Sequence, residues 1–114
     1  MSIWSVTLAA LTSLNKPLAA NRYIPASGSQ LPAEYIVYFL VDSIPAEAAD
    51  DAETLRFHRM QVSYYSTTGL AGMPNIADAM VAAGFTKDTI TEIPFNVDTG
   101  HYGCSNEFIF LEEE

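Results

Sequence analysis

Two histidines and a single cysteine are the residues of this chain with the most versatile chemistry. His101 and Cys104 lie three positions apart in the run His101-Tyr-Gly-Cys104, and His58 lies far upstream. A structural zinc site needs about four ligands of this kind, and the sequence has no second cysteine. We therefore interpret the run as a turn with a partly buried cysteine, and we expect no metal site.

The sequence shows no recognisable catalytic motif. A nucleophilic cysteine needs a base next to its thiol, and only the fold could bring His58 or His101 there. The G-x-S-x-G nucleophile elbow is absent, as are the glycine-rich phosphate loop and the dinucleotide fingerprint. No combination of nucleophile, base and orienting residue is visible. We predict that the protein is not an enzyme and that it uses no cofactor.

The other distinctive chemistry is an acidic segment, Ile44 to Thr54, which has no basic residue. Its carboxylates are Glu47, Asp50, Asp51 and Glu53. The segment lacks the loop glycine and the terminal glutamate of an EF-hand, so calcium binding is not expected. One interpretation is a solvated, mobile loop, and the other is an arm that orders on a basic patch of a partner. We favour a loop that is mobile when free and ordered in an assembly.

Hydrophobic patterning predicts the elements that position these residues. A helix is expected between Ser2, as its N-cap, and Pro17, and a short helix between Pro74 and Ala83. Gly84 is a natural C-cap for the second helix. Strands are predicted at residues 21–24, 35–41 and 55–65. A closing hairpin is predicted to turn at residues 98–100 and to end in a strand at 107–111. Residues 112–114 are expected to form a solvated tail.

The predicted order is α-β-β-β-α-β-β, in one domain that spans residues 1–114. This order corresponds to an α+β fold, with two helices packed on one face of a mainly antiparallel sheet. Met60, Val62 and Tyr64 are expected on one face of the 55–65 strand, opposite Arg59, Gln61 and Ser63.

Several residues are candidates for contacts with another subunit. The strand at 35–41 is apolar on both faces, and helices of the same chain can cover only one of them. The apolar arc of the first helix, which includes Trp4, is wider than the usual core-facing stripe. Arginine is favoured at protein interfaces. The interface candidates are Trp4, Arg56, Arg59 and Tyr65.

Charge and composition limit the function classes. The 114 residues include fourteen acidic and five basic side chains, which gives a formal charge of −9. Such a surface disfavours specific nucleic-acid binding. No apolar stretch approaches the length of a membrane span, and the N-terminus lacks the basic region of a secretory signal. We expect synthesis in the cytosol and no contact with a membrane.

The succession of elements resembles the tail terminator, or tail-completion, family of neck proteins in tailed bacteriophages. The resemblance spans most of the chain and depends on the overall layout. Its parts are the N-terminal helix, Asn21-Arg-Tyr-Ile24, Tyr35-Ile-Val-Tyr-Phe-Leu-Val-Asp42, the acidic loop, Arg59-Met-Gln-Val-Ser-Tyr-Tyr65, the short helix ending Ala82-Ala-Gly-Phe85, and the closing hairpin.

This resemblance implies a structural virion protein that forms a homo-hexameric ring. The ring would cap the tail tube, stop its growth, and present a surface to the head-completion and connector proteins. The genome would pass through its lumen without specific binding. The protein would assemble in the host cytoplasm and reside in the virion neck, and the acidic segment would match the family's mobile inter-strand loop.

Two other functions stay open. One is a different phage neck protein, a head-closure or adaptor component, which would resemble a small β-barrel without a packed N-terminal helix. The other is a small acidic cytosolic module that binds a basic peptide through its acidic loop.

Overall fold

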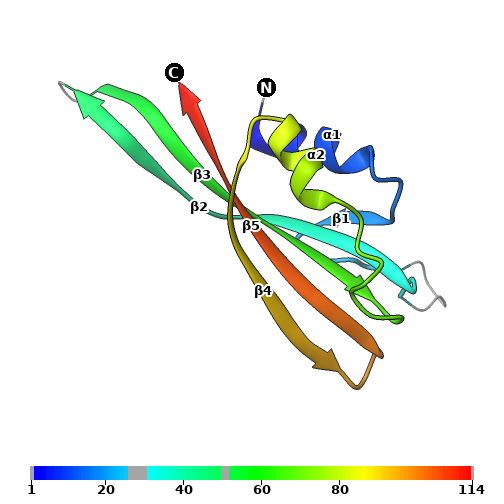
Figure 1. The fold of residues 1–114 in the computed structure, drawn as a ribbon. Helices are drawn as coiled ribbons and strands as arrows, with labels where there is room; N and C mark the ends of the chain where they lie inside the picture. Colours follow the sequence, from blue (N-terminus) through cyan, green and yellow to red (C-terminus); the bar gives the residue numbers. More distant parts are fainter. Residues whose placement is uncertain (1, 26–30, 50–51, 114) are drawn as a thin grey trace.

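In the computed structural model, which describes residues 2–25, 31–49 and 52–113, one five-stranded sheet carries two helices on the same face (Figure 1). The elements are α1 (Ile3–Thr12), β1 (Leu18–Ala20), β2 (Glu34–Ala49), β3 (Ala52–Ser66), α2 (Ile76–Ala82), β4 (Thr86–Asn96) and β5 (His101–Glu113). The strand order is β1-β2-β3-β5-β4, with β1 parallel to β2 and the other pairs antiparallel. The predicted fold class and element order are confirmed.

The first helix begins where the sequence predicts. The Ser2 hydroxyl accepts a hydrogen bond from the backbone N of Ser5 at 3.2 Å, which satisfies one of the free N–H groups of the first turn. Ile3, Thr7 and Leu11 are buried at four-residue spacing, and the Thr7 hydroxyl donates to the Ile3 carbonyl at 2.8 Å. The buried polar group is therefore satisfied, and α1 lies flat on the sheet.

The short strand predicted at 21–24 is wrong in position, because β1 lies at Leu18–Ala20. Asn21 adopts a φ of 63° directly after it. Asparagine tolerates this left-handed conformation better than most residues, and one such residue turns the chain out of the extended form. The Asn21 backbone N still donates to the Tyr38 carbonyl at 2.8 Å, which is the last hydrogen bond between β1 and β2 at this end.

The predicted acidic loop is wrong over the described residues, because β2 and β3 continue through it as a hairpin. Their pairing extends from Glu34 opposite Ser66 to Ala49 opposite Ala52. Irregular register at three points along β2 breaks the two-residue alternation that marks a strand in the sequence. Pro45 fits because β1 reaches only as far as Tyr38, so this part of β2 is an edge.

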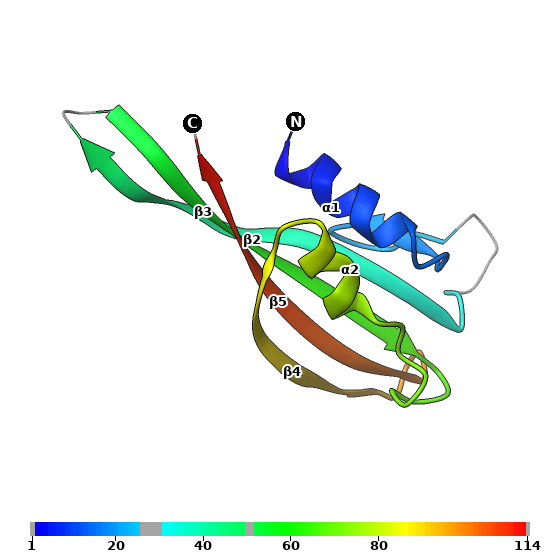
Figure 2. The same ribbon diagram turned by 45° about the horizontal axis from the view of Figure 1, so that its top comes forward.

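The core lies between the sheet and the helices (Figure 2). The predicted inward face of β3 is confirmed, since Met60, Val62 and Tyr64 are at most 1% exposed. The remaining buried members of the cluster are Ile3, Leu11, Ile36, Tyr38, Ile76, Met80, Phe85 and Phe108.

The opposite face of the sheet is covered at one end by aromatic side chains of the same chain. The Tyr35 ring stacks on Tyr65 at 4.9 Å between centroids, and it contacts Tyr23 and His101 at 5.2 Å each. The two-sided burial predicted for this strand therefore holds at Tyr35 and Val37 without a second subunit, whereas Val41 is exposed.

The second helix is shorter than predicted, and Pro74 lies outside it. Asn75 is the N-cap, and its side-chain oxygen accepts from the backbone N of Asp78 at 3.2 Å. Gly84 follows the helix with a φ of +105°, and Phe85 then turns back into the core. Gly84 directly follows the C-cap residue Ala83, and its left-handed conformation ends the helix as predicted.

Gly84→Ala should destabilise the protein by about 1–2 kcal/mol, because alanine is strained at positive φ. A Cβ at this position would also lie 3.2 Å from the Phe110 ring. The measurement is the midpoint of denaturant unfolding. Gly72→Ala is the control, since a Cβ there meets nothing within 4 Å. An equal effect of both substitutions would contradict the role of Gly84 as a cap.

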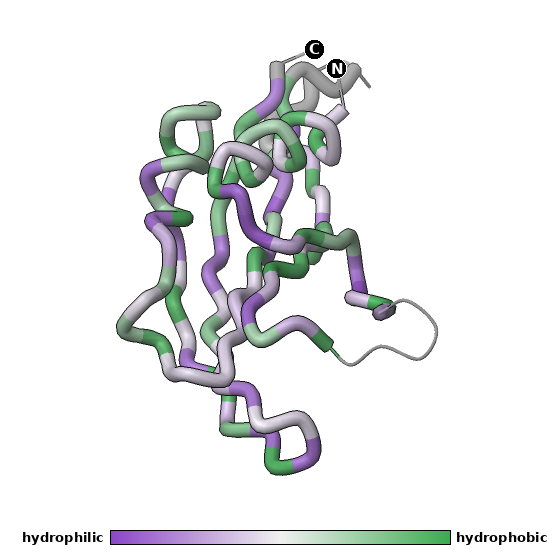
Figure 3. The backbone as a smooth tube through the Cα atoms, turned by 90° about the vertical axis from the view of Figure 1, so that its right-hand side faces the viewer, coloured by the Kyte–Doolittle hydropathy of each residue, from purple (hydrophilic) through white to green (hydrophobic). Residues whose placement is uncertain are grey.

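The closing hairpin is longer than predicted. The turn is confirmed, with Gly100 at a φ of +75° and its N donating to the Asn96 carbonyl at 2.7 Å. The run predicted as a turn at His101–Cys104 is instead the start of β5, and Glu112, predicted in the tail, belongs to the same strand. Small and polar residues at the start of β5 hide the strand pattern there. Figure 3 shows hydrophilic and hydrophobic residues interspersed along the whole backbone.

Candidate functional site

The hairpin of β2 and β3 extends past the helices together with the end of β5 (Figures 1 and 2). We call this projection, residues 41–49, 52–59 and 109–113, the distal arm. The molecule measures 53 Å along its longest axis and 29 and 24 Å along the others. The face of the arm away from the helices is not covered by them, whereas on the helix side Phe110 packs against Phe85 at 5.0 Å between ring centroids.

A row of three large apolar side chains crosses the distal arm. Ile44 is directly opposite Phe57 in the β2–β3 pair, and Phe57 is directly opposite Leu111 in the β3–β5 pair. Phe57 is an odd number of residues from Met60, so the row lies on the face away from the helices. The three side chains are 52%, 39% and 49% exposed. Single exposed apolar residues are common, but a contiguous row suggests an interaction surface.

The next row on the same face is charged. Asp42 and Ile109 pair with Arg59 from either side, and together with Ile44 and Phe57 these residues line a shallow groove of about 250 Å³. The apolar row thus has a charged border, as the centre and rim of a protein interface do.

Arg59 is held by carboxylates of its own chain. It donates to Asp88, lies 3.5 Å from a Glu107 oxygen and 4.0 Å from an Asp42 oxygen. These neighbours, the hydrogen bond to Asp88 first, raise the pKa of the Arg59 guanidinium, although partial desolvation opposes them. Its three partners lie on β2, β4 and β5, so the side chain is held in place next to the apolar row by strands on both sides of β3.

A polar network lies on the helix side of the distal arm. Arg56 donates to the Ser43 carbonyl at 2.9 Å and to its hydroxyl at 3.1 Å. The same hydroxyl lies 3.0 Å from Nδ1 of His58, and Nε2 lies 3.3 Å from a Glu112 oxygen. Because the Glu112 carboxylate only accepts, Nε2–H donates to it, and in the neutral ring Nδ1 then accepts from the Ser43 hydroxyl. It ties β2, β3 and β5 together along the arm.

The four predicted interface residues do not form one surface. Arg56 and Arg59 lie on opposite faces of the distal arm, and Tyr65 is half-buried against Tyr35 at the other end of the sheet. Trp4 is 52% exposed on α1, close in sequence to Leu8 at 45%. The exposed apolar surface of α1 is therefore separate from that of the arm.

The acidic segment is only partly described. Glu47 lies opposite Leu55 and Glu53 opposite Ala48 in the hairpin pairing. Asp50 and Asp51 lie outside the described residues. The predicted partner loop is thus the end of the distal arm rather than a separate flexible connection.

The structure separates His101 and Cys104, the two residues of the run interpreted as a turn. His101 and Cys104 are three positions apart on β5, so their side chains lie on opposite faces of the sheet. Burial, and then the charge of Glu92, raises the pKa of the Cys104 thiol, which disfavours a reactive thiolate. Across residues 2–25, 31–49 and 52–113, no three side chains of the metal-binding types come together.

A second charged cluster links the segment between α1 and β1 to the start of β2 and to the core residue Tyr64. The Lys16 amine lies 2.8 Å from one oxygen of Glu34, and the Tyr64 hydroxyl donates to the other. The bonds to Lys16 and Tyr64 lower the pKa of Glu34. Burial, and then the bond to Glu34, raises the pKa of Tyr64 to about 12.

Glu34→Gln should cost about 1 kcal/mol of unfolding free energy at pH 7, because an ion pair and a charge-assisted hydrogen bond weaken. Since the pKa of Glu34 is lowered on folding, its carboxylate stabilises the native state above the ordinary value of 4.5. This benefit is lost as the pH falls from 4.5 through the folded-state pKa. Denaturant unfolding of both proteins from pH 7 downward measures the difference.

The matched control is Glu92→Gln, which removes the same charge from an exposed position on β4. Its effect should be small at every pH. A deficit of Glu34→Gln that stays constant on acidification would contradict an ionised, partnered Glu34.

No family model matches the chain, and no curated protein matches its sequence. Over the described residues, no helix has the length and apolar character to cross a membrane.

Proposed function

We propose that this protein is a structural virion protein of a tailed phage, whose ring terminates the tail tube and joins it to the head-completion complex. Its distal arm carries this proposal. The arm extends the sheet beyond its own helices and bears an exposed row of Ile44, Phe57 and Leu111. A monomeric domain gains no stability from such a row, whereas a subunit that docks it on a neighbour does.

The positions of the exposed apolar surfaces support a ring. The arm row and the outer side of α1, with Trp4 and Leu8, are different surfaces of one molecule. A contact between unlike surfaces of identical subunits repeats from one subunit to the next, and it closes into a ring when the rotation permits. The role of the ring at the end of the tail tube, and its expected six subunits, are inferred from the resemblance to tail terminators.

Charge supports the same role. A subunit with a formal charge of −9 gives a ring whose surface repels phosphate groups. DNA could pass through the lumen of such a ring without adhering to it. Tail tube protein on one side, and head-completion or connector proteins on the other, are the proposed partners.

The test is the native mass in solution over a concentration series, by light scattering after size exclusion, followed by electron microscopy of any large species. The proposal expects a closed ring that binds the ends of tail tubes. Preference for a head connector over a tube would favour a head-closure or adaptor component. A monomer at every concentration that ignores tail tube would overturn the proposal and favour the peptide-binding module.

A further inference from the structure

We propose that the distal arm of one copy docks on the acid-free surface of a second copy, and that complementary charge directs the contact. The acid-free surface is formed by α1 and the segment after β1, and its exposed members are Trp4, Leu8, Arg22 and Ile24. This inference rests on the proposed function, because it names the partner of the apolar row on the arm.

Acidic and basic residues are unevenly divided along the chain. Residues 1–33 contain two basic residues, Lys16 and Arg22, and no acidic residue. Residues 34–114 contain all fourteen acidic residues against three basic ones, a formal charge of −11. The surface formed by α1, β1 and the segments next to them therefore lacks the negative charge that the rest of the subunit carries.

The acid-free surface includes an exposed apolar flank of α1. Trp4 and Leu8 are 52% and 45% exposed and lie one turn apart. Val6 and Ala10 lie on the opposite flank of the helix, where they pack against the core cluster that includes residues of α2. Trp4 and Leu8 are therefore turned away from α2, towards the edge of the sheet that β1 forms (Figure 2).

A cation lies at the same edge of the sheet. Arg22 comes two residues after β1, the outermost strand on this side, and its side chain is exposed. Ile24, which follows it, is 75% exposed. In the described part of the chain, Arg22 has no ion pair, whereas Lys16 is paired with Glu34. The Arg22 guanidinium is therefore available to a carboxylate of another molecule.

The distal arm has the complementary arrangement. Beside its apolar row, towards the tip of the hairpin, Leu55 lies between Glu47 on β2 and Glu113 on β5 in the strand register. Leu55 is two residues from Phe57, so both rows belong to the sheet face away from the helices. Two acidic positions thus lie next to the apolar row, and residues 44–55 contain no basic residue.

These charges decide which surface of a second copy receives the arm. Two arms placed face to face would bring their acidic rows together, and like charges across an interface are strongly unfavourable. The acid-free surface instead offers apolar side chains together with a guanidinium. The contact therefore joins unlike surfaces, so it repeats from one subunit to the next.

The first test uses the only tryptophan of the chain, Trp4, whose fluorescence reports directly on the acid-free surface. Emission and acrylamide quenching are measured on the full-length protein over a concentration series, with light scattering on the same samples. As the assembly forms, the emission should shift to shorter wavelength and quenching should fall, because an exposed indole becomes buried. Neither change should occur in Phe57→Asp.

The second test reverses charges on the two surfaces. Arg22→Glu and Glu47→Arg should each raise the concentration of half-assembly by about tenfold, because each places like charges together. The double variant should return to within about threefold of the wild type, as expected for two positions that contact each other across the interface. The control is Lys87→Glu, the same change at an exposed position of β4, with an effect below about twofold.

The outcomes separate this contact from the ring itself. An assembly that forms without any change at Trp4, or that ignores both charge reversals, overturns this contact while the proposed function stands. The same holds if the double variant is not restored, or if Trp4 responds only when tail tube is added, since the tube would then be its partner. A chain that stays monomeric at every concentration overturns both.

Discussion

Phe57→Asp should abolish self-association while the domain stays folded. Phe57 is the centre of the apolar row, with Ile44 and Leu111 directly opposite it on either side. Aromatic residues at the centre of an interface contribute most to binding, and a carboxylate buried there without a partner is strongly unfavourable. In the free subunit the side chain is 39% exposed, so the new charge can remain in water. Light scattering measures the mass, and circular dichroism with thermal unfolding tests the fold.

Val97→Asp is the matched control for this prediction. Val97 is 81% exposed beside the turn between β4 and β5, and its replacement adds the same charge far from the distal arm. This variant should assemble as the wild type does. Normal assembly of Phe57→Asp would remove the main support for the proposed function, because the arm would then not be the contact.

Phe108→Ala should cost about 3–5 kcal/mol of unfolding free energy, the usual range for removing a buried aromatic ring. Phe108 is 2% exposed, lies opposite Met60 on β3 and contacts the Phe85 ring at 6.4 Å between centroids. The loss would be a large share of the 5–15 kcal/mol that a typical domain has. Denaturant unfolding at equilibrium measures it, and Phe108→Leu serves if the alanine variant does not fold.

The control is Phe95→Ala, the same substitution on β4. Phe95 is 47% exposed and contacts mainly the exposed ring of Tyr102, at 4.7 Å between centroids. Its loss should be about 1 kcal/mol or less. Similar losses for the two variants would contradict the placement of Phe108 in the core.

The elements with regular hydrophobic periods could be predicted from the sequence. β3 alternates strictly around Met60, Val62 and Tyr64, and the two helices carry recognisable caps at Ser2 and Gly84. These patterns depend on local physics alone, since each residue's face follows from its position in the repeat. They were sufficient for the fold class and for the order of the elements.

The errors occurred where a local irregularity breaks the period. The first strand was predicted too late in the chain, because Asn21 is left-handed and ends it. Bulges along β2 break the alternation that would have indicated the far half of the β2–β3 hairpin. Small polar residues hide the strand pattern at the start of β5. The strand at His101–Asn106 is stabilised by its neighbours, as the bond from Asn106 to the Val62 carbonyl at 3.3 Å illustrates. Such contacts join residues far apart in the chain, so no window of sequence contains them.

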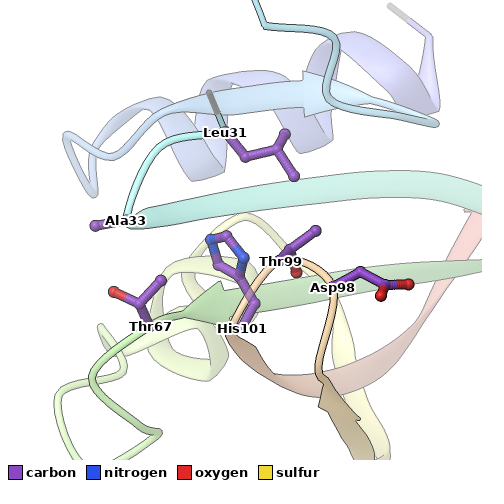
Figure 4. A pocket seen from close by; sticks show the side chains of 6 residues that line it. All are labelled: Leu31, Ala33, Thr67, Asp98, Thr99 and His101. Carbon is purple, nitrogen blue, oxygen red and sulfur yellow. The ribbon is translucent and has the colours of Figure 1, made fainter. Parts of the chain in front are cut away.

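The candidate site was less predictable than the fold. Arg56 and Arg59 were correctly associated with the strand that carries the apolar row, but the row itself needs the register of three strands. The cavity at the opposite end of the sheet, lined by Leu31, Thr67 and His101 among others (Figure 4), likewise needs three separate segments of the chain.

The strand order has a consequence for the newly synthesised chain. β4 has its sheet partner in β5, and β5 also closes the free edge of β3, yet β5 is the last of these strands to be made. Until it arrives, β4 has no place in the sheet and β3 presents unpaired backbone groups. The long-range pairing of β3 with β5 therefore depends on the residues made last, and until it forms, the open edge of β3 is exposed to aggregation.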